Sequence, residues 1–149
     1  MAAELRGETI RFRIPGDPKY VATVRRAIRS LANSLGFSED IAEDIEISVA
    51  EALTNAVEHG SPEQRKNAVA VVCRVADDRL TIDVRDEGPG FDMPEAETQW
   101  EMLEERGRGL RLIYHLMDKV RVCHTPRGSR IRMVKKLSPV EAQPVKPAR

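Results

Sequence analysis

Apolar and polar residues alternate with a period of two in five segments of the chain, which is the pattern of half-buried β-strands. These segments are Thr9 to Ile14, Ala68 to Val75, Arg79 to Arg85, Lys119 to Thr125 and Ser129 to Lys135. A short turn joins the second and third segments, so they are expected to form a hairpin. Pro126 and Gly128 separate the last two strands, which close the predicted domain.

Three further segments repeat apolar residues at the helical spacing of three and four. The predicted helices cover Asp17 to Gly36, Ser38 to Gly60 and Gly107 to Met117. Asp17 and Ser38 suit the N-cap position, because their side chains can accept hydrogen bonds from free amides at a helix start. The outer face of the first helix is expected to carry Arg25, Arg26 and Arg29.

These elements predict an α/β (α+β) two-layer sandwich, in which one mixed, largely antiparallel sheet carries its helices on one face. The predicted domain covers residues 8–137. Within it, the segment from Phe91 to Arg106 has no clear period and is interpreted as a long loop, a feature that is usually functional or disordered in compact domains. Residues 138–149 are predicted to be a disordered tail.

Composition narrows the possible functions. The chain has 149 residues, of which 24 are basic and 24 acidic, so its net charge is zero. This balance argues against nucleic acid as a partner, because binding to phosphate backbones needs an excess of Lys and Arg. No run approaches the roughly 18 apolar residues of a membrane span, and the N-terminus lacks a signal peptide, so we expect a cytoplasmic protein without membrane contact. Cys73 and Cys123 lie in apolar alternating runs and are expected to be buried, reduced thiols.

Candidate chemistry begins in the second predicted helix. Glu51, Asn55 and Glu58 are spaced by four and three residues, so they share one face beside the apolar stripe. For an isolated helix, such a line of polar residues is more often a solvated face than a site. Other motifs in the chain favour a functional site over a solvated face.

Two glycine-containing segments follow. Asp86-Glu87-Gly88-Pro89-Gly90 comes directly after a strand, where glycines let a backbone approach a planar ligand and Asp86 can accept from an exocyclic amine. Arg106-Gly107-Arg108-Gly109-Leu110 begins a helix, whose free amides favour phosphate. Each segment alone is weak, since either can be a simple turn.

Taken together, the motifs Glu51-x-x-x-Asn55-Ala56-x-x-His59-Gly60, Asp86-x-Gly88-x-Gly90, Gly107-x-Gly109-Leu110 and Gly128-Ser129 are specific. In this order they resemble the Bergerat-type ATP-binding fold of type II topoisomerases, sensor histidine kinases and mismatch-repair ATPases. Within that superfamily the sequence is most similar to the small bacterial anti-sigma factor serine-protein kinases.

The resemblance implies a role for each matching residue. Asn55 should ligate Mg²⁺ on the ATP phosphates and Glu51 should act as general base, roles that suit an amide oxygen and a carboxylate one turn away. Asp86 should accept the adenine amino group, with Gly88 and Gly90 lining the base pocket and Ser129 completing the adenine contacts through water. The phosphate segment should contribute Gly107 and Gly109 through their amides, with Leu110 behind them. The loop of residues 91–106 corresponds to a lid over ATP.

Arg106 departs from the family pattern, which often has a glycine there. Arg106 and Arg108 either contact the γ-phosphate or are solvated, and the residues alone leave both alternatives open. A P-loop, a dinucleotide fingerprint and a metal-ligand spacing of His and Cys are all missing from the sequence.

Two functions remain. The resemblance implies an ATP-dependent serine kinase that acts as an anti-sigma factor: it would phosphorylate an anti-anti-sigma protein of the STAS type and sequester a sigma factor in a partner switch. The alternative is a nucleotide-gated regulatory binding protein without productive phosphotransfer, which would need Asp86 and the glycines but not Glu51. The sequence leaves open whether the protein forms a homodimer.

Overall fold

Five strands form one sheet in which every neighbouring pair is antiparallel, in the order β1-β2-β3-β5-β4. The structure is a computed structural model, and it describes residues 2–88, 108–125 and 127–137. The strands are β1 (Thr9–Pro15), β2 (Ala68–Val75), β3 (Arg79–Arg85), β4 (Lys119–Thr125) and β5 (Gly128–Lys136). The closing hairpin β4–β5 thus places β5 beside β3, in the interior of the sheet.

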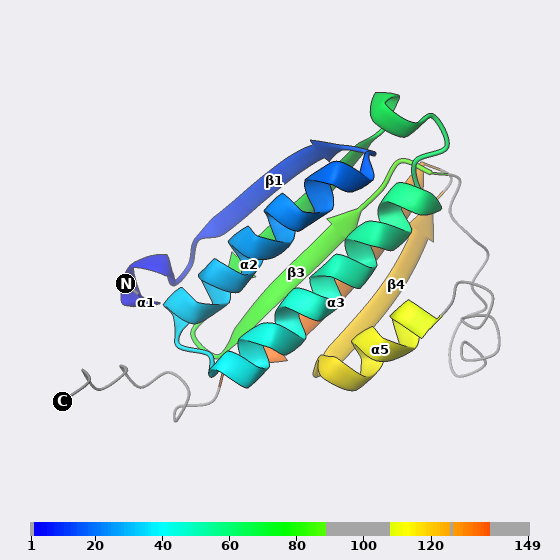
Figure 1. Cartoon of the computed structure of the whole chain (residues 1–149). Helices are drawn as coiled ribbons and strands as arrows, with labels where there is room; N and C mark the ends of the chain where they lie inside the picture. The colour runs from blue at the N-terminus through cyan, green and yellow to red at the C-terminus, as the bar shows by residue number, and fades with distance from the viewer. Residues whose placement is uncertain (1, 89–107, 126, 138–149) are drawn as a thin grey trace.

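The helices α2, α3 and α5 lie side by side on one face of this sheet (Figure 1). The helices are α1 (Ala2–Leu5), α2 (Val21–Leu35), α3 (Glu39–Glu58) and α5 (Arg108–Leu116), and two single turns of 3₁₀ helix cover Pro18–Tyr20 and Gln64–Lys66. No helix of the described part of the chain is long and apolar enough to cross a membrane.

The ends of the long helices follow from local chemistry. The Ser38 hydroxyl accepts a hydrogen bond from the amide of Ile41 at 3.3 Å and so begins α3. Gly36 ends α2 with a φ of 93°, a left-handed conformation that favours glycine. Asp17 accepts from the amide of Lys19 at 3.1 Å, but it caps the 3₁₀ turn that precedes α2 rather than α2 itself.

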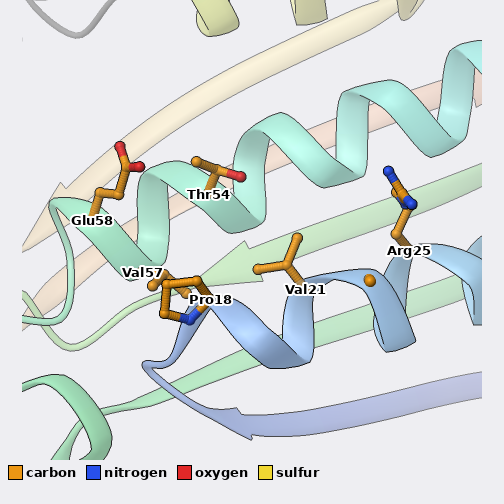
Figure 2. A pocket seen from close by; sticks show the side chains of 7 residues that line it. Pro18, Val21, Arg25, Thr54, Val57 and Glu58 are labelled. Carbon is orange, nitrogen blue, oxygen red and sulfur yellow. The ribbon is translucent and has the colours of Figure 1, made fainter.

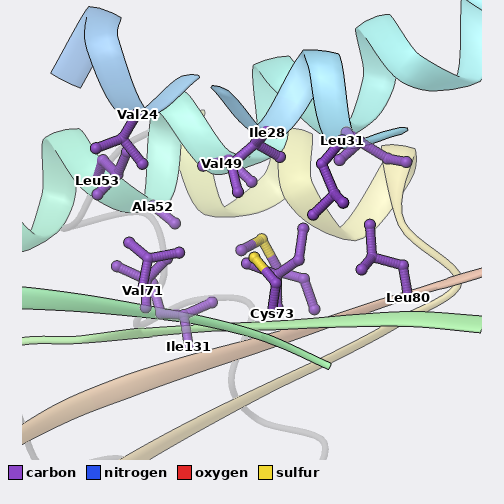
Figure 3. Close-up of a cluster of buried hydrophobic side chains, with 14 of the residues drawn as sticks. Val24, Ile28, Leu31, Val49, Ala52, Leu53, Val71, Cys73, Leu80 and Ile131 are labelled. Atoms are coloured by element: carbon purple, nitrogen blue, oxygen red, sulfur yellow. The ribbon is translucent and has the colours of Figure 1, made fainter. Parts of the chain in front are cut away.

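The core lies between the helices and the sheet (Figure 3). Because side chains alternate along a strand, Val71 and Cys73 of β2 point to the helices while Val72 and Arg74 point away. The fully buried residues include Ile28, Ile45, Val49, Leu53, Ile82, Ile113 and Met133. These side chains fix α3 across the middle of the sheet.

The predicted two-layer sandwich with helices on one face is confirmed, but the sheet is entirely antiparallel among the described strands, so its expected mixed character is wrong. Pattern alone cannot tell strand direction; the hairpin connections set it. The predicted loop of residues 91–106 and the predicted tail of residues 138–149 lie outside the described residues.

Two expectations about individual side chains are wrong. Arg25 and Arg29 do not lie on an outer face, because they bridge α2 to α3: Arg29 Nη1 is 2.6 Å from Glu46 Oε2, and Arg25 Nε is 3.4 Å from Glu46 Oε1. Cys73 is buried as expected, but Cys123 is exposed because its strand position faces away from the helices.

Candidate functional site

Asp86 follows β3 directly and is held in place by backbone amides. Its Oδ1 accepts hydrogen bonds from the amides of Gly88 and Ser129, each at 3.0 Å. Its own amide donates to the Ser129 carbonyl at 2.9 Å. The carboxylate orientation therefore depends on the β4–β5 hairpin, 43 residues later in the chain.

Glycines allow the backbone to pack closely around Asp86. A Cβ at Gly60 would overlap the Asp86 carboxyl group, and one at Gly128 would overlap the Asp86 carbonyl oxygen. A Cβ at Gly88 would lie 2.5 Å from the Cα of Gly60. Since real Cβ atoms do not approach other atoms this closely, only glycine fits these positions without a shift of the backbone or of Asp86.

A narrow pocket opens beside this carboxylate, between α3, α5, β3 and β5. It is lined by Ala52, Asn55, Ala56, Val84, Asp86, Leu110, Ser129 and Ile131. Most of the wall is apolar, and the polar groups of Asn55, Asp86 and Ser129 converge on it. Apolar walls with a few placed polar groups are typical of a small-ligand site.

Asn55 carries an unsatisfied polar group into this pocket. Its side chain is buried, with 9% of its surface exposed. Its Nδ2 has no hydrogen-bond partner in the part of the chain that the structure describes. A buried donor without a partner costs about 1–3 kcal/mol, so this amide is placed at the expense of stability.

Glu51 lies one helical turn before Asn55 on α3 and faces the start of α5. A Cβ at Gly109, the second residue of α5, would overlap the Glu51 carboxylate. The start of a helix carries partial positive charge, which stabilises a carboxylate there and attracts phosphate to the same place. A carboxylate and a helix start of the kind that favours phosphate are thus adjacent.

The structure brings most of the sequence-predicted site residues together. Asn55, Asp86, Leu110 and Ser129 line the one pocket. Gly88 contacts Asp86, and Glu51 contacts Gly109 beside the pocket. The remaining predicted residues, Gly90, Arg106, Gly107 and the Arg108 side chain, lie outside what the structure describes.

Sequence reasoning gave no role to Gly60 and Gly128, although both stood in the quoted motifs. Their importance is steric, because each meets Asp86 from a different direction. The only sequence signal was a glycine directly after a helix and another directly before a strand. That signal does not show which side chain such a glycine will meet.

A second hollow lies between α2 and α3 (Figure 2). It is lined by Pro18, Val21, Ala22, Arg25, Thr54, Val57 and Glu58. Glu58 therefore lines this groove and not the pocket of Asn55. The helix spacing had predicted one shared face for Glu51, Asn55 and Glu58, and Glu58 does not share their site. The groove has an apolar floor with a basic and an acidic residue among its walls.

The sheet thus carries a buried Asn on the central helix α3 and an Asp that backbone amides hold after the central strand β3. Residues 14–135 match the histidine kinase-like ATPase domain family. The serine-protein kinase RsbW of Bacillus velezensis is 36% identical, covering 87% of this chain and 86% of that protein. RsbW of Bacillus subtilis is also 36% identical, over 76% of each chain.

Solved structures share the fold. The RsbU and RsbW domains of a Mycobacterium tuberculosis protein superpose with a TM-score of 0.66 at 22% identity, covering 86% of this chain and 31% of that chain. The histidine kinase domain of a blue-light-activated kinase from Erythrobacter litoralis gives 0.57 at 22% identity, covering 86% of this chain and 64% of that one. The protein belongs to the histidine kinase-like ATPase domain family and, within it, to the RsbW-type serine-protein kinases.

Proposed function

We propose that this protein is an ATP- and Mg²⁺-dependent serine kinase that acts as an anti-sigma factor. Its substrate would be an anti-anti-sigma protein of the STAS type, and its alternative partner a sigma factor. The unphosphorylated antagonist would bind the kinase and free sigma; phosphorylation would release the antagonist, so that the kinase recaptures sigma. Sequence similarity to the RsbW serine-protein kinases, at 36% identity over most of the chain, supports a serine-kinase activity.

One observation of the site carries the proposal: the buried Nδ2 of Asn55 has no hydrogen-bond partner among the described residues, and Asn55 shares a pocket with Asp86. A binding pocket that retains an unsatisfied amide is suited to a polar ligand, because the ligand recovers the cost of burying that group. Asp86 would accept the adenine amino group between Gly88 and Gly90, with Ser129 completing the contacts to the base. The amides of Gly107 and Gly109 would bind the phosphates ahead of Leu110.

Mg²⁺ fits Asn55 as a shared ligand. An amide oxygen is the hard type of donor that Mg²⁺ prefers. Within the described ranges, no group of three His, Cys, Asp or Glu side chains could hold a metal ion by themselves, so the ATP phosphates would have to complete the coordination. Bound Mg²⁺ would neutralise phosphate charge.

Glu51 would supply the base for phosphoryl transfer. The serine oxygen would bond to the γ-phosphorus, the bond from that phosphorus to ADP would break, and the hydroxyl proton would pass to the Glu51 carboxylate. The position of Glu51 against Gly109 supports this role, because the start of α5 is also where phosphate binds best. Arg106 and Arg108 would add positive charge near the γ-phosphate.

The groove between α2 and α3 would receive a protein partner. Val21 and Val57 give it an apolar floor, and Arg25 and Glu58 give it charges of both signs. It adjoins the same helix that carries Glu51 and Asn55, so a partner seated there would lie near the phosphates. Residues 91–106 would correspond to a lid over ATP that couples nucleotide binding to partner binding.

Transfer from γ-labelled ATP to a STAS-type protein of the same organism tests the proposal. Wild type should label a serine, and Glu51→Gln should lower the rate by about 10² to 10⁴ while ATP still raises the melting temperature. Glu43→Gln, an exposed carboxylate on the same helix, is the matched control and should transfer normally. ATP binding without any label in wild type would contradict the kinase and favour the nucleotide-gated binding protein.

A further inference from the structure

The face of the sheet that points away from the helices is strongly basic. The strand register places ten basic side chains on this outer face: Arg11, Arg13, Arg74, Arg79, Arg85, Lys119, Arg121, Arg130, Arg132 and Lys136. Asp83 is the one acidic residue at the outer-face positions of the five described strands. Because the whole chain is neutral, this concentration of charge leaves an excess of acid elsewhere.

Asp83 organises the centre of the outer face. Its carboxylate is fully buried and accepts two hydrogen bonds from Arg132, at 2.7 and 2.9 Å. Arg74 donates to it at 3.0 Å and Arg85 at 3.3 Å. One carboxylate therefore orients three guanidinium groups and leaves most of their positive charge uncompensated. Each guanidinium has five donors, so several donors remain to meet an anion.

Sheet stability does not account for this arrangement. Arg85 lies directly opposite Arg130 on neighbouring strands, and Arg121 lies directly opposite Arg132. Like charges in directly opposite positions destabilise a sheet. Asp83 offsets this repulsion at Arg85 and Arg132, to which it is hydrogen-bonded, but in the described part of the chain it makes no hydrogen bond to Arg121 or Arg130. The arginines beyond those that Asp83 orients are therefore suited to meeting an anionic ligand.

One end of the outer face contains a hollow lined by Arg85, Asp86, Cys123, Arg127, Gly128, Ser129 and Arg130. Within the described part of the chain, the buried Nε of Arg130 has no hydrogen-bond partner. Asp86 and Ser129 also line the pocket on the helix side of the sheet. An acidic group in this basic hollow would thus sit behind the residues proposed to contact adenine.

We propose that the outer face of the sheet is a docking surface for an acidic protein, separate from the groove between α2 and α3. Because its charged residues are almost all basic, this surface favours a strongly acidic partner. Eight of its ten basic residues are Arg, the residue enriched in protein interfaces, where Lys is depleted. Val72 and Val134 lie between the arginines but are buried, so this surface offers a partner mainly charge and guanidinium donors.

Other occupants fit this surface less well. No described aromatic side chain lies at an outer-face strand position to stack on a base. The only large hydrophobic residue exposed among the described residues is Leu112, on α5, so an apolar anchor for a membrane is missing from this face as described.

The first test measures binding of a fluorescent deca-glutamate peptide to the full chain. Wild type should bind it at low salt, and the double variant Arg121→Glu/Arg130→Glu should raise the Kd by about tenfold or more. The matched control Arg26→Glu/Lys66→Glu, at two exposed basic residues outside the strands, makes the same change in net charge and should change the Kd little. ATP-dependent thermal stabilisation checks that each variant is folded, and Glu51→Gln should bind the peptide normally whether or not it transfers phosphate.

Three results would overturn the proposal. Equal loss of binding in Arg26→Glu/Lys66→Glu and in the double variant Arg121→Glu/Arg130→Glu would show diffuse attraction. Tighter binding to a DNA oligonucleotide or to phosphatidylserine vesicles than to the peptide would assign the face to nucleic acid or membrane. Self-association of wild type that the double variant abolishes would assign it to a second copy.

A second test identifies the partner. A photo-crosslinking amino acid in place of Thr81, which lies on the outer face, should capture an acidic protein in cells. The purified partner should lose binding to Arg121→Glu/Arg130→Glu and regain it when its own acidic residues are replaced by Arg. A captured protein that binds wild type and the double variant equally would overturn the proposal.

Discussion

The carboxylate of Glu51 lies against the α-carbon of Gly109, so closely that a Cβ at Gly109 would overlap Oε2. Glu51 belongs to the middle of α3 and Gly109 to the first turn of α5. Contact between them places a carboxylate at a helix start that favours phosphate. Glu51 can therefore occupy this position only because residue 109 has no side chain.

Gly109→Ala tests this contact. The overlapping atom is the end of a flexible side chain, so Glu51 should rotate away and the protein should remain folded, with helix propensity gaining up to about 1 kcal/mol. Phosphotransfer should nevertheless fall by about 10² or more, approaching Glu51→Gln. Single-turnover transfer and urea unfolding measure the two effects. Full activity in Gly109→Ala would show that Glu51 need not occupy its position in the structure.

Asn55→Ala should separate stability from function. Removing a buried amide that lacks a partner offsets part of the packing lost, so the free energy of unfolding without nucleotide should change by less than about 1 kcal/mol. The Mg²⁺-dependent part of ATP stabilisation should disappear. Melting temperatures with ATP, with and without Mg²⁺, measure this difference. A large loss of stability in the absence of nucleotide would mean that Asn55 is structural.

Gly60→Ala should damage the adenine side of the site. The new Cβ would overlap the Asp86 carboxyl group, which two backbone amides hold in place, so the strain cannot be relieved by a simple rotation. We expect a loss of about 1–3 kcal/mol in the free energy of unfolding and weaker ATP binding. His59→Ala, at the exposed neighbouring residue, is the control. Equal ATP affinity in Gly60→Ala and wild type would contradict the role assigned to Asp86.

Asp83 should make stability depend on pH in the acid range. Burial alone would raise the pKa of this carboxyl, but hydrogen bonds from Arg132 and Arg74 outweigh it and lower the pKa from 3.8 to about 2. A lowered pKa contributes stability above the unfolded value, and this contribution is lost as pH falls through the folded value. Wild type should lose about 2 kcal/mol from this group between about pH 4 and pH 2.

Asp83→Asn should lack this component of the acid transition and should be destabilised at pH 7, by about 3–5 kcal/mol, because three arginines would then face one another without a carboxylate. Urea unfolding at several pH values measures both effects. Parallel pH curves for wild type and variant would show that Asp83 does not hold the low pKa.

The two thiols should differ sharply in reactivity. Burial and the charge of Asp83 raise the pKa of Cys73 to about 12, whereas Cys123 is exposed. A thiol reagent at pH 8 should therefore modify Cys123 rapidly and Cys73 only when the protein opens. Cys123→Ser should remove the fast phase of absorbance change. Two fast phases in wild type would contradict the burial of Cys73.

Local pattern was enough to predict most of the elements. The strands Ala68–Val75 and Arg79–Arg85 have the boundaries that alternation predicts, because one face of each is buried and the other is not. Ser38 and Gly36 mark the ends of neighbouring helices because capping and left-handed backbone depend only on adjacent residues. The exposure of Cys123 was missed, since an apolar run does not show which of its two faces is covered.

The sequence by itself determined most elements and the two-layer class, because alternation and helical spacing are local properties. It marked Glu51, Asn55 and Asp86 as candidates through a resemblance that depends only on the order and spacing of motifs along the chain. Only the tertiary structure decided which distant atoms meet. Ser129 holds Asp86 from 43 residues away, and Gly109 makes room for Glu51. It also gathered arginines from five strands on one face, since strand order and register are set by packing across the whole sheet.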